Sequence, residues 1–376
     1  MSTLSAVVGA FQTPYSPCVN QQSLEEMIFA ATTGALNDAG LTIDAIDAVV
    51  LSVSDQASGR IIESMVTNGP SGGVDRDVTT LASSSEHALC YANLRILAGQ
   101  SQRILVVAWG KPSEGVDPTH AEILAAEPFL LRPLGMRAVV AAGLQASQYI
   151  SRYPIEPNAG TQLRESRALA SERAYGLPEG YFDDETSKDF IAWPLTEADL
   201  PRRCDLAAAV VLVHPDAVTP DQTPAWVTGI GWATDGYEIA DRDLCELTSL
   251  RTATATALGD RSIEDFDVIE MTEISTIGSF IAAEALGLET AGNGSRIVSR
   301  TAPALNPSGG NLMINPGNAG GFMRMLQAAQ QIRGKAGPVQ IHPTPGTAVG
   351  VGSHGFAAQG SAVMTFSATR DNRNEV

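Results

Sequence analysis

Ser83 and His87 have the residue types and the spacing of a nucleophilic pair. They lie four positions apart at the start of a segment with helical periodicity, so they would share one face of a helix. A histidine beside a serine hydroxyl can accept its proton and so create a nucleophile. The structural alternative is that the three serines at 83–85 are N-cap and first-turn residues. The sequence leaves both interpretations open.

Glu273 is a second group with chemical potential, because it follows the buried strand expected at 268–270. Loss of solvation at the end of such a strand would raise the pKa of the carboxyl group and let it act as a base. The same carboxylate can equally be a hydrogen-bonded structural group. Glu273 is therefore a candidate base with a structural alternative.

The elements that would position these groups begin with a strand and a helix. Residues 6–11 form a short apolar run that predicts a strand. Ser23 and Glu26 have the spacing of a capping box, which predicts a helix from there to Ala39. Gly40 stands where a helix C-cap is expected.

Two pairs of segments occur in both halves of the sequence in the same order. The turn and strand expected at 43–51 recur at 263–270. A helix followed by a strand, expected at 85–108, recurs at 317–341, with the second strand at 339–341. This repetition predicts an internal duplication. Strands that alternate with helices predict an α/β fold with mainly parallel pairing.

The predicted halves are residues 1–220 and 221–376, joined near a polar, proline-rich linker at 219–224. Residues from about 111 to 203 interrupt the pattern, because they are rich in proline, arginine and acidic residues. We expect this stretch to be an inserted loop domain in the first half that covers a ligand site. A surface elaboration without a ligand role is the alternative.

The charge balance limits the partners of the chain. There are 42 acidic and 24 basic residues, and the formal net charge is −18. A duplex nucleic acid needs a basic face and is not an expected partner, whereas a local pocket can still bind an anion through backbone N–H groups and a few arginines. The sequence has no signal-peptide pattern at its start, and no apolar run approaches about 18 residues. We therefore expect a cytoplasmic protein without a membrane span.

The cysteines suggest neither a metal centre nor a disulfide framework. Cys18, Cys90, Cys204 and Cys245 form no C-x-x-C pair. We expect no metal site and no redox motif.

Several motifs resemble those of the thiolase superfamily, and they cover nearly the whole chain. The most specific is Asn-Pro-Ser-Gly-Gly at 306–310, which in that family stands just before a Gly-His-Pro motif. Residues 268–288 match the family's second-half strand and helix without a gap, and 204–211 resemble its Asp-Gly-Ala-Ala-Ala strand. The pattern is most similar to the sterol-carrier-protein-x or lipid-transfer type of thiolase. The resemblance implies two duplicated α/β halves in a five-layered α-β-α-β-α arrangement with an inserted loop domain.

The first of four catalytic motifs implied by this resemblance has changed. In the family, a cysteine thiolate at a strand-to-helix turn takes the acyl group. Matching Ala88 and Leu89 to the family's trailing Ala-Leu puts Ala82 at the cysteine position. Alanine cannot form an acyl-enzyme, whereas a shift of one residue would put Ser83 there. Cys90 should lie two turns into the helix, in the core.

Two further motifs have lost a histidine. The family's His-Asp-x-Phe aligns with residues 272–275, so Thr272 replaces the imidazole and Glu273 keeps a carboxylate. In Gly-His-Pro-x-Gly-Ala-x-Gly the histidine is Asn315, whose amide can donate to an oxyanion but cannot transfer a proton. Gly317 and its neighbouring glycines would let the backbone approach a thioester closely, or would allow tight packing of the two halves.

His354 survives in the fourth motif. The family's His-Asn-x-Gly-x-Gly-Gly-Ala corresponds to residues 354–361, and His354 keeps its spacing to the last strand. It is the best single candidate for catalysis or thioester recognition, with a buried structural histidine as the alternative. Tyr237 lies in a region that borders the pocket in relatives, with a packed surface aromatic as the alternative. The candidate substrate-binding residues are Ser83, His87, Asn315, Gly317 and Tyr237.

Loss of the nucleophile argues against a competent thiolase and leaves three hypotheses. The first is a thiolase-like acyl-CoA-binding protein that catalyses a non-thiolytic carbon–carbon step such as retro-aldol cleavage. That reaction needs a base and an oxyanion site but no acyl-enzyme, so Glu273 or Tyr237 with His354 could suffice. The second is a non-catalytic pseudo-thiolase subunit of a heteromeric thiolase. The third is residual acyl transfer through Ser83 and His87.

The resemblance also implies a ligand and partners. A coenzyme A thioester is the expected ligand, with no covalently bound cofactor. Thiolase-like aldolases of sterol side-chain degradation act with a zinc-ribbon/OB-fold protein, so such a heteromer is one expectation. Thiolases dimerise through the strand that precedes the nucleophile, so a homodimer or a heteromer with a thiolase homologue is the other.

Overall fold

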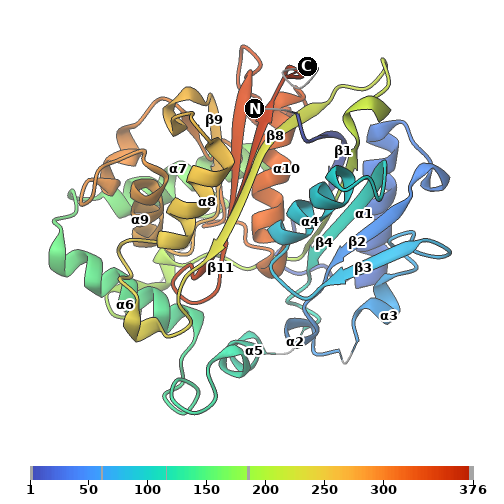
Figure 1. Ribbon diagram of the computed structural model, residues 1–376. Helices are drawn as coiled ribbons and strands as arrows, with labels where there is room; N and C mark the ends of the chain where they lie inside the picture. The colour runs from blue at the N-terminus through green and yellow to red at the C-terminus, as the bar shows by residue number, and fades with distance from the viewer. Residues whose placement is uncertain (1–2, 61, 116, 184–186, 372–376) are drawn as a thin grey trace.

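The computed structural model describes residues 3–60, 62–115, 117–183 and 187–371, and Figure 1 shows how its elements are arranged. The strands are β1 (Ser5–Gln12), β2 (Ala48–Ser52), β3 (Asp77–Leu81), β4 (Arg103–Gly110), β5 (Phe190–Ala192), β6 (Leu195–Thr196), β7 (Leu206–Val213), β8 (Ala225–Thr234), β9 (Val268–Met271), β10 (Ala304–Leu305), β11 (Thr347–His354) and β12 (Gly360–Ser367). The α-helices are α1 (Leu24–Ala39), α2 (Asp55–Ser58), α3 (Ser64–Thr67), α4 (Glu86–Leu97), α5 (Pro118–Ala125), α6 (Ala138–Arg152), α7 (Ala159–Tyr175), α8 (Thr248–Leu258), α9 (Thr276–Leu286) and α10 (Gly320–Ile332). No helix within the described ranges is long and apolar enough to cross a membrane.

The large sheet of the described chain contains two halves with the same internal order. The first half runs β1-β7-β4-β2-β3, and the second runs β8-β12-β11-β9-β10. In each half the first two pairings are antiparallel and the last two are parallel. The halves join where β1 pairs with β8 in the antiparallel direction. The shared order and directions confirm the predicted internal duplication.

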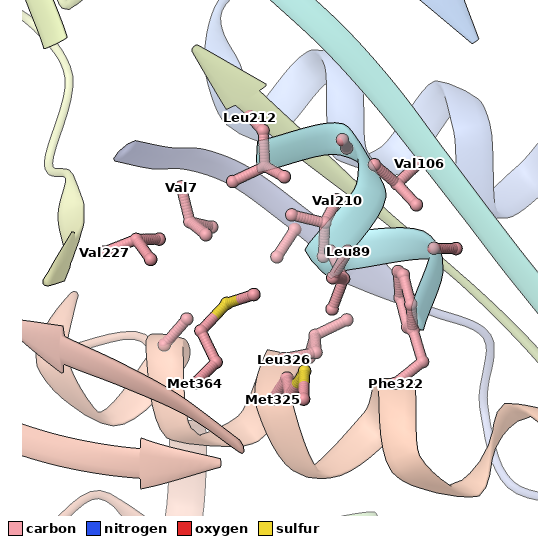
Figure 2. Close-up of a cluster of buried hydrophobic side chains, with 14 of the residues drawn as sticks. Val7, Leu89, Val106, Val210, Leu212, Val227, Phe322, Met325, Leu326 and Met364 are labelled. Atoms are coloured by element: carbon pink, nitrogen blue, oxygen red, sulfur yellow. The ribbon is translucent and has the colours of Figure 1, made fainter. Parts of the chain in front are cut away.

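The two half-sheets enclose a central layer formed by α4 and α10. Figure 2 shows this contact, in which Leu89 of α4 and Phe322 and Leu326 of α10 lie among side chains of both half-sheets. Val210 comes from the first half-sheet and Met364 from the second, and all five side chains are buried. Burial of apolar surface on both faces of these helices contributes roughly 25 cal/mol per Å² to the stability of the fold.

The outer faces of the half-sheets are covered by the remaining helices of the duplicated units. α1 packs on the first half-sheet, and α8 and α9 pack on the second, in two further apolar clusters. The layers therefore follow the order α-β-α-β-α. This arrangement confirms the five-layered fold that the motifs predicted.

Local sequence signals define both ends of α1. Oγ of Ser23 accepts the N–H of Glu26, and the Glu26 carboxylate accepts the N–H of Ser23, so the predicted capping box is present. Gly40 ends the helix in the left-handed region with φ 66°, which costs glycine little because it has no Cβ.

The connection from β4 to β7 carries α5, α6, α7 and the small β5–β6 sheet. The equivalent connection in the second half, from β11 to β12, is a tight turn at 355–359. In Figure 1 α5 and α6 lie along the lower edge of the molecule, and α5 contacts α2. The difference between the halves supports an insertion in the first, while its limits at about 111–203 and the division at 220 stay predictions.

The prediction of a strand at 339–341 is wrong. This segment holds a 3-10 turn at Gly337–Val339 and a loop, and the strand equivalent to β4 is β11, which begins at Thr347. The apolar residues of this segment are typical of a strand. Its backbone, however, forms hydrogen bonds with side chains instead of with a neighbouring strand. Gln331 accepts the N–H of Ile341 through Oε1, and it donates from its side-chain amide to the carbonyl of Val339.

Candidate functional site

A large cavity lies where the two halves and the insertion meet, and its volume is ≈ 840 Å³. Its walls come from the segments after β3 and β9, the end of β11, the start of α10, and the insertion. Ligand sites of α/β folds lie at the carboxyl ends of parallel strands, which is where these segments stand. Seven predicted site residues line it, namely Ala82, Ser83, Thr272, Glu273, Asn315, Gly317 and His354.

Two other predicted residues lie elsewhere. His87 is half-buried, and its ring contacts that of His354 rather than forming the cavity wall. Tyr237 is 62% exposed and does not line the cavity. Its position favours the surface alternative over substrate binding.

His354 contacts a carboxylate that the sequence analysis did not single out. Nδ1 of His354 lies 2.8 Å from Oε1 of Glu86, which is completely buried. Ser84 donates from Oγ to the other carboxylate oxygen, at 2.6 Å. The pair joins the start of α4 in the first half to the end of β11 in the second.

The state of Glu86 decides which nitrogen of His354 carries a hydrogen. Burial alone would raise the pKa of Glu86, but the hydrogen bond and charge of His354, with the bond from Ser84, outweigh burial and hold the pKa below its usual range. A carboxylate has no hydrogen to donate, so Nδ1 of His354 is the donor. In the neutral imidazole Nε2 is then the acceptor, and this is the form that a general base needs.

Three glycines leave the space that this pair occupies. A Cβ at Gly321 of α10 or at Gly352 of β11 would overlap the side chain of Glu86. A Cβ at Gly360 of β12 would overlap the imidazole of His354 at Nε2. None of the three glycines has a positive φ. Glycine is therefore needed at these positions to leave space for the neighbouring side chains, and not because of the backbone conformation.

Replacing Glu86 with glutamine tests the charge of the buried group. Because the pKa is lowered in the folded protein, the anion stabilises the fold above the ordinary glutamate pKa of about 4.3, and this contribution is lost as pH falls through the folded value. We expect Glu86→Gln to lower the free energy of unfolding near neutral pH, with a difference from wild type that shrinks in acid. Denaturant unfolding against pH measures this. The exposed Glu165→Gln is the control, and a pH-independent difference for Glu86→Gln would contradict the charged state.

The serines before α4 do not cap the helix. Oγ of Ser83 lies 2.9 Å from Nδ1 of His87. Oγ of Ser85, the N-cap residue, makes no capping bond and instead accepts the N–H of Phe322 in α10 at 3.1 Å. The middle serine bonds the buried carboxylate described above. Each hydroxyl therefore has its own polar partner in or beside the cavity wall.

His87 and His354 lie edge to face, with ring centroids 4.9 Å apart. Burial lowers the pKa of His87, the charge of Glu86 opposes this effect, and the proximity of His354 adds to it. The net lowering favours a neutral imidazole, which can accept a proton from Ser83 near neutral pH. The Ser83–His87 pair and the His354–Glu86 pair are thus direct neighbours.

The two positions without the expected histidine have different surroundings. Oγ1 of Thr272 accepts the N–H of Ser353 at 2.7 Å and so links β9 to β11. Oδ1 of Asn315 accepts the N–H of Gly317 at 3.1 Å. This bond fixes the orientation of the amide and leaves Nδ2 of Asn315 as a donor at the cavity wall. An amide N–H in such a place can bind an oxyanion.

Glu273 is a buried, ion-paired carboxylate. Its Oε1 accepts from Nε of Arg167 in α7 at 2.7 Å, and its Oε2 accepts the N–H of Asn311 at 3.2 Å. Arg167 also donates to the carbonyl of Leu305. These bonds tie the insertion to the second half and favour the structural alternative for Glu273.

No thiol faces the cavity. All four cysteines lie in the described ranges, and none lines the cavity, whereas Ala82 does. Cys90 is buried in the central core, as predicted. Burial, with a smaller contribution from the charge of Glu86, raises the pKa of the Cys90 thiol to about 12, so this cysteine is not a thiolate at neutral pH.

Arg137 is a further site residue that the sequence analysis missed. It precedes α6 and lines the cavity, and its guanidinium makes no hydrogen bond or ion pair with the rest of the described chain. Arg203, another cation of the wall, is paired with Glu122 at 2.7 Å. An unpaired guanidinium is suited to a phosphate or carboxylate group. Among the described residues, no group of three or more His, Cys, Asp or Glu side chains is arranged to hold a metal ion.

Sequence comparisons connect the chain to thiolases. Residues 231–366 match the family described as "Thiolase C-terminal domain-like". The sequence is 25% identical over 392 residues to acetyl-CoA acetyltransferase of Methanothermobacter thermautotrophicus, covering 96% of this chain and 99% of the relative. It is also 34% identical over 111 residues to sterol carrier protein 2 of Oryctolagus cuniculus, covering 27% of this chain and 19% of that protein.

Solved structures share the fold over the full length of the chain. The Ltp2-ChsH2(DUF35) aldolase superposes with a TM-score of 0.76 at 16% identity, covering 97% of this chain and 98% of that one. Human mitochondrial 3-ketoacyl-CoA thiolase in complex with CoA superposes with a TM-score of 0.67 at 16% sequence identity, covering 98% of this chain and 99% of that one. Acat5 thiolase from Ascaris suum in complex with coenzyme A superposes with a TM-score of 0.70 at 14% sequence identity, covering 96% of this chain and 99% of that one. The family match, the full-length similarity and the thiolase fold confirm the resemblance to the thiolase superfamily.

Proposed function

We propose that the chain binds an acyl-CoA thioester in this cavity and cleaves a β-hydroxyacyl-CoA by a retro-aldol reaction. The observation that carries the proposal is the His354–Glu86 pair together with the Asn315 amide, on a wall that Ala82 also lines and to which no cysteine of the described chain contributes. This set offers a base and an oxyanion donor but no thiol. Similarity to an aldolase supports the reaction class, and similarity to CoA-bound thiolases supports the ligand.

In the proposed reaction, Nε2 of His354 takes the proton of the substrate's β-hydroxyl group. The oxygen electron pair forms the carbonyl of a ketone or aldehyde, the bond between Cα and Cβ breaks, and its electrons enter the thioester as an enolate. Nδ2 of Asn315 hydrogen-bonds the enolate oxygen. His354 then returns the proton to Cα, which yields a shorter acyl-CoA. Glu86 is a positioning residue that orients the imidazole and stabilises its charged form.

Binding of the anionic ligand is proposed to use Arg137. The chain carries a formal charge of −18, so an acyl-CoA needs a local cation. Arg137 meets this need at the cavity wall, because its guanidinium is not paired with any carboxylate of the described residues. The glycine at 317, which is exposed and has φ 56°, lets backbone approach the ligand in the same wall.

We further propose that the active form is a heteromer with a zinc-ribbon/OB-fold protein, with a homodimer formed along β3. Support for the first comes from the Ltp2-ChsH2(DUF35) aldolase, whose name pairs two components. Support for the second is the position of β3, which ends the sheet in the described chain and has one edge free. A free edge can pair with the same strand of a second copy.

The proposal is tested by incubating the chain with a β-hydroxyacyl-CoA in the absence of free CoA, alone and with a zinc-ribbon/OB-fold protein from the same organism. Mass spectrometry should detect a ketone or aldehyde and a shorter acyl-CoA, in larger amount when the partner is present. Absence of both products under both conditions would refute the proposal. Co-purification with a cysteine-bearing thiolase would then support the alternative, a non-catalytic pseudo-thiolase subunit.

A further inference from the structure

We propose that Ser83, with His87 as its base, is a second reactive group of the cavity that accepts the acyl group of a CoA thioester and hydrolyses it slowly. This activity differs from retro-aldol cleavage because it breaks the carbon–sulfur bond and needs no β-hydroxyl group. It rests on the binding part of the proposed function, since a CoA thioester must enter the same cavity.

The geometry of the pair is that of a serine nucleophile with its base. Oγ of Ser83 lies 2.9 Å from Nδ1 of His87, within the hydrogen-bond distance that general-base activation requires. His87 is half-buried and lies edge to face on His354. Packing against a second ring limits the orientations of the imidazole and keeps Nδ1 directed at the hydroxyl.

The hydroxyl is also in the right place to meet a substrate. Ser83 is exposed and lines the cavity, directly after the position that Ala82 occupies. It does not serve the helix, because α4 begins at Glu86 and the N-cap residue is Ser85. Asn315 lines the same cavity, and its amide N–H donates to no acceptor among the described residues, so an oxyanion donor is available for a tetrahedral intermediate.

The proposed reaction has two balanced steps. Oγ of Ser83 attacks the thioester carbonyl, His87 accepts the hydroxyl proton, and the C–S bond breaks as that proton passes to the CoA sulfur. The products are an acyl ester on Ser83 and free CoA. Water, deprotonated by His87, then attacks the ester, which releases a carboxylic acid and returns the proton to Oγ. The sum is a thioester plus water giving a carboxylic acid plus a thiol.

The test uses butyryl-CoA, which has no β-hydroxyl group and cannot undergo retro-aldol cleavage. Released CoA is measured with a thiol reagent, and acylated protein is measured by intact mass followed by peptide mapping. We expect the wild type to release CoA at least about 10-fold faster than Ser83→Ala, and any adduct to map to Ser83. His87→Gln should slow release by a factor that approaches the loss in Ser83→Ala, because His87 acts only by activating Ser83.

Two further variants keep the outcome decisive. Ser151→Ala removes an exposed hydroxyl that bonds only the carbonyl of Gln148, and it should release CoA like the wild type. Ser83→Cys should be acylated faster than wild type, because a thiol is the stronger nucleophile. The inference would be overturned if the wild type and Ser83→Ala release CoA at the same rate and no acyl adduct forms at position 83 in the wild type or in Ser83→Cys. Retro-aldol cleavage of a β-hydroxyacyl-CoA is scored separately, so the two proposals can fail independently.

Discussion

Replacing His354 with alanine is expected to lower kcat for β-hydroxyacyl-CoA cleavage by roughly 10²–10⁴-fold, which is the contribution that a positioned general base makes. The imidazole is the group that accepts and returns the proton in the proposed reaction, and Glu86 holds it at 2.8 Å. KM should change little, since in the proposed complex the acyl-CoA is held by other groups such as Arg137. Steady-state kinetics on the purified variant measures both constants.

Two companion variants separate the role of His354 from general damage. His342→Ala changes an exposed histidine outside the cavity and should keep wild-type kinetics. Gly360→Ala keeps the histidine in the sequence but puts a methyl group where its ring now lies, so the ring must move and kcat should also fall. A His354→Ala protein that is folded and retains more than about a tenth of the wild-type kcat would contradict the role of His354 as the base.

Replacing Glu273 with alanine is expected to lower the free energy of unfolding by about 3–5 kcal/mol, as removal of one partner from a buried ion pair usually does. Arg167 would keep its charge in a buried site without the carboxylate that now lies 2.7 Å away. The N–H of Asn311 would also lose its acceptor. Denaturant unfolding followed by circular dichroism measures the change.

The surface pair of Glu156 and Arg296 supplies a matched control. Its atoms are 3.5 Å apart, and both side chains are more than half exposed, so Glu156→Ala should cost at most about 1 kcal/mol. The double variant Glu273→Leu with Arg167→Met should recover much of the lost stability, because no buried charge is left unpaired. A Glu273→Ala protein with wild-type stability and no activity would instead make Glu273 the base.

The duplicated fold could be predicted because both halves carry the same local signals. The turn and strand at 43–51 and at 263–270 are contiguous patterns, and the caps at Ser23 and Gly40 act over a few residues. The strand at 339–341 was predicted wrongly because the side chain of Gln331 satisfies that segment's backbone at Ile341 and Val339. Hydrogen bonds from side chains can satisfy a backbone in place of strand pairing, and they leave no periodic pattern in the sequence.

The site could be predicted only where residues are close in sequence or match a motif. Ser83 and His87 were paired by spacing, and the structure brings them together. Glu86 was overlooked although it stands next to His87, because its partner His354 is 268 positions away and meets it only when β11 lies against α4. Arg137 gave no signal, since it lies in the insertion and its lack of a partner among the described residues is a property of the folded chain.

The central claim is that this thiolase fold breaks carbon–carbon bonds without a nucleophilic thiol, and a comparison of two substrates tests it most directly. The purified chain, with the zinc-ribbon/OB-fold protein proposed as its partner, is given either a β-hydroxyacyl-CoA without free CoA or a β-ketoacyl-CoA with free CoA. The products are quantified by mass spectrometry. The account predicts a carbonyl product and a shorter acyl-CoA from the first substrate and no thiolysis of the second. Thiolysis of the β-ketoacyl-CoA, with no cleavage of the β-hydroxyacyl-CoA, would contradict it.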